Sequence, residues 1–142
     1  MSERQQVEPV IERLLVLNIQ TRLRSTIRAM PLGDRTVFDI DGGSFEGSGL
    51  RGQILPSGGD WLIRTATGSQ MDVRMLLQTD DGVTFLLSYT GRASQREGNP
   101  HIEIIGSFDA PEGRYAWLNQ IQAFGLGTPV AGGIRYRLYR FR

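Results

Sequence analysis

The chain of 142 residues contains no cysteine and no lysine, and its only histidine is His101. Without cysteine there are no disulfides, thiolate nucleophiles or cysteine–zinc sites. Without lysine there is no Schiff-base chemistry and no lysine general base. A single histidine cannot form a multi-histidine metal site. We therefore expect no metal site and no bound cofactor.

Strong net charge and long apolar runs are also missing. The formal net charge is +1, which gives no general attraction to nucleic acid or to a membrane surface. Arg135 and Arg137 alternate with Tyr136 near the C-terminus, a pattern typical of a strand with one solvated face rather than a nucleic-acid stripe. With no signal peptide pattern and no long apolar segment, the expectation is a soluble cytoplasmic protein.

Glycine, in contrast, is abundant, with 18 residues. It is poor in helix interiors and common in turns and bent strands, so its abundance favours β structure. From Ile11 onward the chain alternates short apolar–polar segments with turn signals, which is typical of a sandwich or barrel. The expected strands are Ile11–Leu23, Thr36–Ile40, Gly49–Leu55, Trp61–Ala66, Gln70–Thr79, Val83–Thr90, Ile102–Phe108, Tyr115–Phe124 and Ile134–Phe141.

The fold predicted from this pattern is all-β, an antiparallel up-and-down barrel of lipocalin-like size. Residues 1–10 are polar and interrupted by Pro9, so they are expected to form a short irregular extension before a single domain over residues 11–142. Helix remains an alternative for Ile11–Leu17.

Two turn signals predict how the central strands pair. Asp81-Gly82 is typical of a two-residue hairpin turn and would place Arg74 opposite Tyr89. Thr67-Gly68 is a weaker signal of the same kind and would place Trp61 opposite Arg74. Both registers give one shared face, which carries Trp61, Ile63, Asp72, Arg74, Leu76, Phe85, Leu87 and Tyr89.

This face combines apolar side chains with one polar cluster, as small-molecule pockets do. Aspartate is disfavoured in mid-strand, so Asp72 is interpreted as a base or orienting carboxylate. Arg74 would stabilise an oxyanion, and Tyr89 would donate a proton. The alternative is that Asp72 and Arg74 form an exposed ion pair. The opposite face, with Met71, Val73, Met75 and Leu77, is apolar enough to be the inner one, and a one-residue slip would exchange the two.

Other motifs have simpler explanations. Gly47–Gly52 matches G-x-G-x-x-G, but Pro56 and two glycines follow where a nucleotide-binding helix would have to begin. Asp81 fits turn chemistry, and Asp60 fits a turn or cap beside Gly58-Gly59. His101 and Glu103 alternate on one strand and are expected to form a surface pair.

Several short motifs, taken in order, resemble the family catalogued as domain of unknown function 3237, also called uncharacterised protein family 0311. The resemblance runs from about Leu15 to the C-terminus. It rests on Gly42–Gly47, Leu50–Pro56, Gly58–Trp61, Asp72–Arg74, Thr79–Gly82 and Trp117–Asn119.

The resemblance implies an antiparallel barrel with a ligand-sized interior, and some relatives act as cofactor-free cyclases or isomerases. The leading hypothesis is a cofactor-independent isomerase, cyclase or lyase acting on an aromatic or polyketide-like metabolite. The alternatives are a non-catalytic carrier of an apolar ligand, or a structural domain that forms a homodimer. The expected catalytic residues are Asp72, Arg74 and Tyr89, and the expected substrate-binding residues are Arg35, Asp60, Trp61, Ile63, Phe85 and Leu87.

Overall fold

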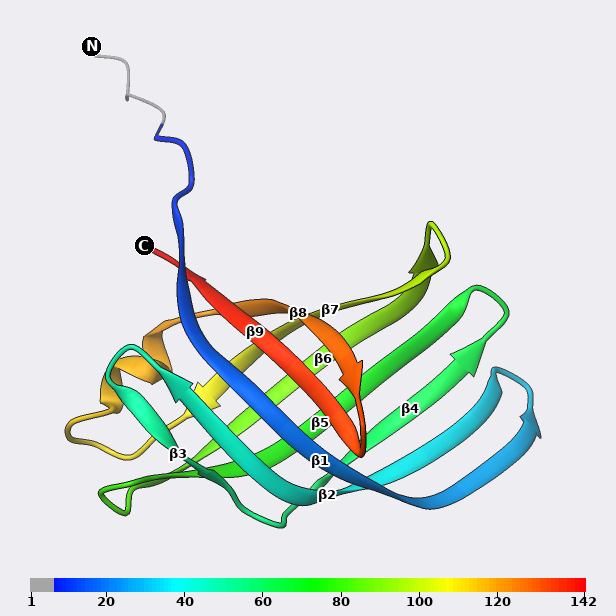
Figure 1. The fold of residues 1–142 in the computed structure, drawn as a ribbon, viewed down its shortest axis with the longest axis horizontal. Coiled ribbons are helices and arrows are strands. Elements are labelled where there is room, and N and C mark those ends of the chain that lie inside the picture. Colours follow the sequence, from blue (N-terminus) through cyan, green and yellow to red (C-terminus); the bar gives the residue numbers. More distant parts are fainter. Residues whose placement is uncertain (1–6) are drawn as a thin grey trace.

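The computed structural model describes residues 7–142, which form nine β-strands and one short 3₁₀ helix, η1 (Figure 1). No helix in this part of the chain is long and apolar enough to cross a membrane. The elements are β1 (Ile11–Met30), β2 (Gly33–Gly47), β3 (Leu50–Ile54), β4 (Gly59–Thr65), β5 (Gly68–Thr79), β6 (Thr84–Arg96), β7 (Asn99–Asp109), η1 (Ala116–Gln120), β8 (Ala123–Val130) and β9 (Gly133–Phe141).

The strands form a single antiparallel sheet that closes on itself. Successive strands from β5 to β9 pair in order around the sheet, with η1 on the connection between β7 and β8, and β9 then pairs with β1. β1 also pairs with β2. The short strands β3 and β4 both lie between β2 and β5, and each pairs with both of them along a different part of their length. The predicted all-β antiparallel barrel is therefore confirmed, and the alternative of helix at Ile11–Leu17 is wrong because these residues lie in β1.

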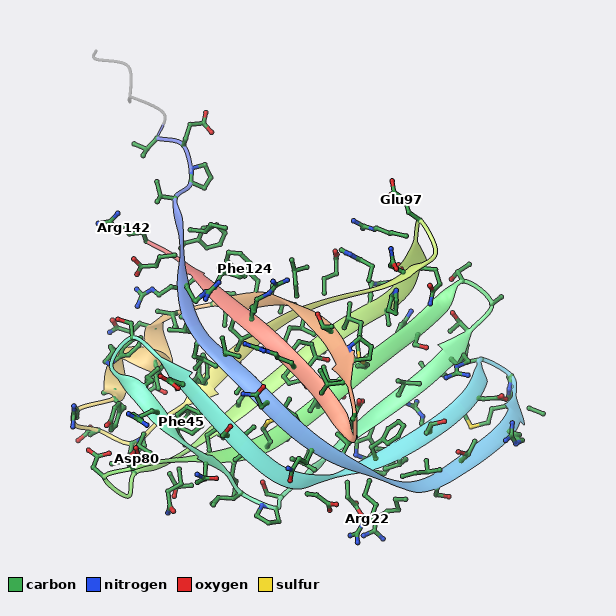
Figure 2. The ribbon with its side chains drawn as sticks, in the orientation of Figure 1. Arg22, Phe45, Asp80, Glu97, Phe124 and Arg142 are labelled. Carbon is green, nitrogen blue, oxygen red and sulfur yellow. The ribbon has the colours of Figure 1, made fainter. Side chains whose placement is uncertain are left out.

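The barrel is closed over only part of its length. β9 pairs with β1 as far as Gln20, and β8 pairs with β7 as far as Ile102. Beyond these points the β1–β2, β4–β5 and β6–β7 hairpins continue without β8 and β9, and their tips lie along the right of Figure 1. We call this side, with Glu97 at one of its tips in Figure 2, the open end, and the side with Asp80 the closed end.

The core lies inside the sheet and follows the two-residue period of each strand. On β5, Met71, Val73, Met75 and Leu77 are buried, whereas the residues between them are exposed or half-buried. Phe45 and Phe85 pack edge to face inside the barrel, with ring centroids 5.8 Å apart. Each such large apolar side chain contributes roughly 1.5–3 kcal/mol when it is fully buried.

The closed end is covered by η1, where the predicted strand Tyr115–Phe124 is wrong. Residues 116–120 are helical, and β8 begins only at Ala123. The Asn119 side-chain amide accepts from the backbone N–H of Ala110 at 2.7 Å and donates to its C=O at 2.8 Å. These bonds hold the turn of helix over the barrel, so that Leu118 is completely buried.

The β5–β6 hairpin differs from the predicted register by one residue. The N–H of Gly82 bonds to the C=O of Thr79, and Gly82 has a φ of +88°. This is a three-residue loop that ends in a left-handed glycine, rather than a two-residue turn. Arg74 consequently lies opposite Ser88, and the predicted pairing of Arg74 with Tyr89 is wrong.

The β4–β5 hairpin turns at Ala66-Thr67, because Thr65 pairs with Gly68. The predicted turn at Thr67-Gly68 is therefore wrong, and each residue of β4 pairs with a β5 residue two positions earlier than predicted. A shift of two leaves each side chain on the same side of the sheet. Trp61, Asp72 and Arg74 therefore do share a face, as predicted, but it is the outer one.

Glycines of the G-x-G-x-x-G segment bend the β2–β3 hairpin. Gly47 ends β2, Gly49 has a φ of +72° in the turn, and Gly52 lies in β3. A side chain at Gly52 would meet the C=O of Gln78 on β5. The segment is strand and turn, as expected from the residues that follow it, and it opens no helix.

Candidate functional site

The wall of the barrel divides the predicted site residues into two groups. By the alternation of their strands, Arg35, Trp61, Ile63, Asp72 and Arg74 lie on the outer side. The inner side carries Asp60, Phe85, Leu87 and Tyr89, all of which are buried. The predicted catalytic group of Asp72, Arg74 and Tyr89 is therefore not assembled, because its phenol lies inside and its two charged groups outside.

Phe85 and Leu87, predicted to contact a substrate, are core residues. They are 2% and 1% exposed and lie opposite Leu77 and Met75. Phe85 also packs against Phe108, with ring centroids 5.8 Å apart.

Asp60 is the chemically unusual group inside the barrel. Only 7% of it is exposed, and it is one of two buried polar residues among those the structure describes. Its Oδ1 atom is buried and has no hydrogen-bond partner among residues 7–142. Burial raises the pKa of Asp60 to about 6, and the negative charge of Asp72 adds to the shift.

The backbone before Asp60 explains how a carboxyl group comes to lie inside. Gly58 has a φ of +63°, and a side chain there would meet the C=O of Arg74. Gly59 passes close to the C=O of Phe38, which a side chain at Gly59 would meet at 2.8 Å. Two glycines in succession let β4 begin tightly between β2 and β5, and the next residue, Asp60, then turns inward.

The position of Asp60 is also where the barrel begins to open. Asp60 lies opposite Phe38, which lies opposite Leu23. Phe38 is half-buried and Leu23 is 58% exposed. Leu23 belongs to the part of β1 beyond its last pair with β9. The acid is thus buried, but the inward-facing residues on one side of it are increasingly accessible.

Two phenols lie near this carboxyl group. Tyr89 lies opposite Val73, which in turn lies opposite Asp60, and its ring centroid is 5.4 Å from that of Tyr136. The Tyr136 hydroxyl donates to Met71 Sδ at 3.8 Å. Burial raises the pKa of both phenols, and the negative charge of Asp60 contributes to each shift. Both hydroxyls therefore stay protonated and can donate hydrogen bonds at neutral pH.

Sequence reasoning missed Tyr136 as a site residue. The sequence does carry a signal, because Tyr136 and Leu138 alternate with two arginines and so predict one apolar face, and in the structure both are 1% exposed. Without the register of β9 against β1 and β8, however, this alternation does not say which other residues the ring meets.

Outside the barrel, two shallow hollows meet at Trp61 and Asp72. The first has a volume of about 500 Å³ and includes Arg35, Ile63 and Arg92 in its lining. The second, of about 570 Å³, includes Arg74 and the ion pair between Arg24 and Asp39. Five of the predicted site residues thus do line a concave surface, although it lies outside the barrel.

Asp81, at the closed end, makes contacts that stabilise the fold. Its Oδ1 accepts from the hydroxyls of Thr79 at 2.5 Å and Tyr115 at 2.9 Å, and its Oδ2 pairs with Arg114 at 3.1 Å. The hydrogen bonds from Thr79 and Tyr115 lower the pKa of Asp81. The carboxylate therefore ties the β5–β6 turn to the segment before η1, beyond the turn role that the sequence predicts.

His101 and Glu103 form the surface pair expected from their spacing. His101 Nε2 lies 2.8 Å from Glu103 Oε2, and Arg96 lies 3.8 Å from the same oxygen. The hydrogen bond from His101 lowers the pKa of Glu103. Within residues 7–142 no group of three or more histidine, cysteine, aspartate or glutamate side chains is arranged to hold a metal ion.

The chain belongs to the family described as protein of unknown function (DUF3237), whose model matches residues 9–141. A relative from Rhodopseudomonas palustris, UPF0311 protein RPA1785, is 30% identical over 86 residues. That match covers 58% of this chain and 56% of the relative. The family resemblance in the sequence motifs is therefore confirmed.

Solved structures share the fold over its whole length. A β-barrel-like protein from Acinetobacter baumannii AYE has a TM-score of 0.92 and 25% identity, covering 99% of this chain and 100% of its own. An enzyme from Penicillium herquei has a TM-score of 0.80 and 19% identity, with coverages of 99% and 100%. The barrel is thus a fold shared with at least one enzyme, and at this identity the likeness concerns the fold alone.

Proposed function

We propose that this barrel binds a small molecule through its open end and transfers protons on it with Asp60, without a cofactor. The reaction classes that fit are isomerisation, cyclisation and elimination on an aromatic or polyketide-like metabolite. The observation that carries the proposal is the buried carboxyl group of Asp60, whose Oδ1 has no hydrogen-bond partner in the part of the chain that the structure describes.

The pKa of Asp60 suits this role. A general base works best when its pKa lies near the working pH, because it must be ionised and yet hold a proton well. At about 6, the pKa of Asp60 leaves the group mostly ionised at neutral pH but much more basic than an exposed aspartate. Strongly shifted carboxyl groups in apolar surroundings are frequent at catalytic sites.

The neighbouring phenols complete the chemistry. When Asp60 removes a proton next to a carbonyl group, negative charge develops on the carbonyl oxygen. A protonated phenol that donates a hydrogen bond to this oxygen stabilises the charge, most strongly in a site that excludes water. Tyr89 and Tyr136 are the candidate donors, and Asp60 then returns its proton to the product.

A suitable probe is nitrobenzisoxazole, whose ring opening requires only a base. The base removes the ring C–H proton, the N–O bond breaks, and a cyanophenolate forms that absorbs visible light. We expect the wild-type protein to accelerate this reaction with a rate that rises through pH 6. Asp60→Asn should lose about 100-fold or more of the acceleration.

The matched control is Asp109→Asn, which removes an exposed carboxylate and should keep the wild-type rate. A rate in Asp60→Asn equal to that of wild type would refute catalysis by Asp60. Binding of the probe without any acceleration would instead favour the carrier alternative.

A second comparison separates Asp60 from the base predicted by sequence alone. If Asp72 were the base, Asp72→Asn would abolish the reaction. If Asp60 is the base, Asp72→Asn should retain the reaction and move its midpoint to lower pH, because the negative charge of Asp72 contributes to the raised pKa of Asp60. The pH dependence of the rate in both variants decides between them.

A further inference from the structure

The outer wall carries a concave surface that is separate from Asp60. Its centre is Trp61, which is 55% exposed although it lies in the middle of β4. The hollow of about 500 Å³ beside it is lined from β2, β4, β5, β6 and β7. Ile63, 8% exposed, and Ile105, 53% exposed, supply further apolar surface to the same hollow.

Three arginines around Trp61 lack ionic partners. Among the described residues, Arg35, Arg74 and Arg92 have no carboxylate within 4.0 Å, whereas neighbouring Arg24 pairs with Asp39 at 2.7 Å. Arg35 Nη1 donates to the C=O of Trp61 at 3.1 Å, which holds this guanidinium group beside the indole. Arg35 also lines the hollow.

The two acidic residues that line the hollow, Asp72 and Glu103, differ in whether they form ion pairs. Glu103 is occupied by His101 and Arg96. Asp72 forms no ion pair and no side-chain hydrogen bond within the described part of the chain. Asp72 is therefore free to accept a hydrogen bond from a hydroxyl or amino group of a ligand.

We propose that this hollow binds a small aromatic carboxylate that also carries a hydroxyl or amino group. The aromatic ring stacks on Trp61, and the carboxylate pairs with Arg35 and Arg92, whose planar guanidinium groups match a carboxylate in two-point hydrogen bonding. Asp72 accepts from the hydroxyl or amino group at the far end of the ring. The site is separate from Asp60, since the barrel wall lies between them, although the charge of Asp72 contributes to the raised pKa of Asp60.

The test uses the two indole N–H signals of the chain, which come from Trp61 and Trp117 and are assigned with Trp117→Phe. Addition of para-hydroxybenzoate should shift the Trp61 signal and leave that of Trp117 in place. The neutral analogue para-hydroxybenzyl alcohol should bind at least about tenfold more weakly, because it lacks the charge-assisted hydrogen bonds.

Variants locate the contacts. Arg92→Gln should raise the dissociation constant for para-hydroxybenzoate about tenfold or more, while Arg51→Gln, the same change at an exposed site paired with Asp80, should not alter it. Asp60→Asn should bind the probe like wild type, so failure of this site and failure of the Asp60 proposal are distinguishable.

Three outcomes would overturn the proposal. The first is equal affinity for the acid and the alcohol, and the second is an unchanged dissociation constant in Arg92→Gln. The third is a homodimer in sedimentation experiments in which Trp61 is covered, since the face would then serve a second copy of the chain.

Discussion

Asp60 and Trp61 are adjacent in the chain, yet their side chains have opposite environments. The carboxyl group is 7% exposed inside the barrel and the indole is 55% exposed outside it. In most strands this alternation places the apolar residue inside and the polar one outside. Its inversion at this dipeptide means that the fold accepts a cost at Asp60, which is typical of positions retained for function.

This cost predicts a pH-dependent effect of Asp60→Asn on stability. The pKa of Asp60 is about 6 in the folded protein, against roughly 3.9 in an unfolded chain. Between these values the folded state holds a proton that the unfolded state has lost, so Asp60 destabilises the wild type as the pH rises from 4 to 6. The stability of Asp60→Asn relative to wild type should therefore increase by up to about 3 kcal/mol between pH 4 and pH 7.

Urea unfolding of both proteins at a series of pH values measures this difference. Taking the difference cancels the contributions of Asp81 and Glu103, whose lowered pKa values act in the opposite direction. A constant difference across this pH range would mean that the pKa of Asp60 is not raised.

At the level of elements, β8 shows that a glycine on the inner side of the sheet makes room for a large side chain on the neighbouring strand. Gly127 lies opposite Tyr136, and a side chain on Gly127 would meet Tyr136 Cε1 at 2.4 Å. Tyr136 is 1% exposed, so its ring has little room to move. The glycine therefore makes space for the phenol that faces the candidate site.

Gly127→Ala should consequently destabilise the protein by about 1–3 kcal/mol through overpacking. It should also reduce proton transfer on nitrobenzisoxazole by displacing Tyr136. The control is Leu126→Ala, which changes an exposed residue of the same strand. Thermal unfolding gives the stability of both variants, and the nitrobenzisoxazole assay gives their rates. Equal stabilities and equal rates in Gly127→Ala and Leu126→Ala would contradict this interpretation.

The elements also show how far sequence reasoning reaches. The alternation in Gln70–Thr79 predicts a strand and identifies Met71, Val73, Met75 and Leu77 as one face. It does not say whether that face is the inner one. Asp81-Gly82 is compatible with a hairpin loop of two or of three residues. This difference of one residue in loop length decides whether the Tyr89 side chain lies on the same side of the sheet as Asp72 or on the opposite side.

Local patterns also fail where tertiary contacts determine the structure. The segment Tyr115–Phe124 has strand-like composition, but the bonds of Asn119 to Ala110 make part of it helical. β8 contains two glycines and a proline, a composition typical of a loop, and it forms a strand because β7 and β9 pair with it. The residues around Asp60 predict only a turn or cap, because its burial depends on strands distant in sequence, and only the family resemblance predicted it as a binding residue.

On the scale of the whole molecule, the two ends of the barrel differ in how many strands support them. Toward the closed end β8 and β9 close the sheet between β7 and β1, and η1 covers the core there. At the open end, residues 22–30 of β1 pair with β2 alone. One register shift, at Gln20/Thr21, precedes this pairing, and two more, at Leu23/Ser25 and Ile27/Met30, interrupt it. Such bulges, together with Arg22 and Arg28, discourage pairing of the free edge with another chain.

Hydrogen exchange should reveal this difference. Amides of β1 between residues 22 and 30 should exchange through local opening at much lower free energy than those between residues 14 and 19. The latter lie between β2 and β9 and are largely buried. Residue-resolved exchange of the free protein tests this, and equal protection along β1 would indicate that the open end is as cooperative as the rest.

The barrel wall is only one backbone thick between Asp60 and Asp72, and this allows the two sides to influence each other without any movement. The outer charge of Asp72 is felt at the inner carboxyl group, where it helps to hold the proton. A protein engineer could therefore adjust the acidity of the interior from the surface, by replacing Asp72 and leaving every packed side chain of the core in place.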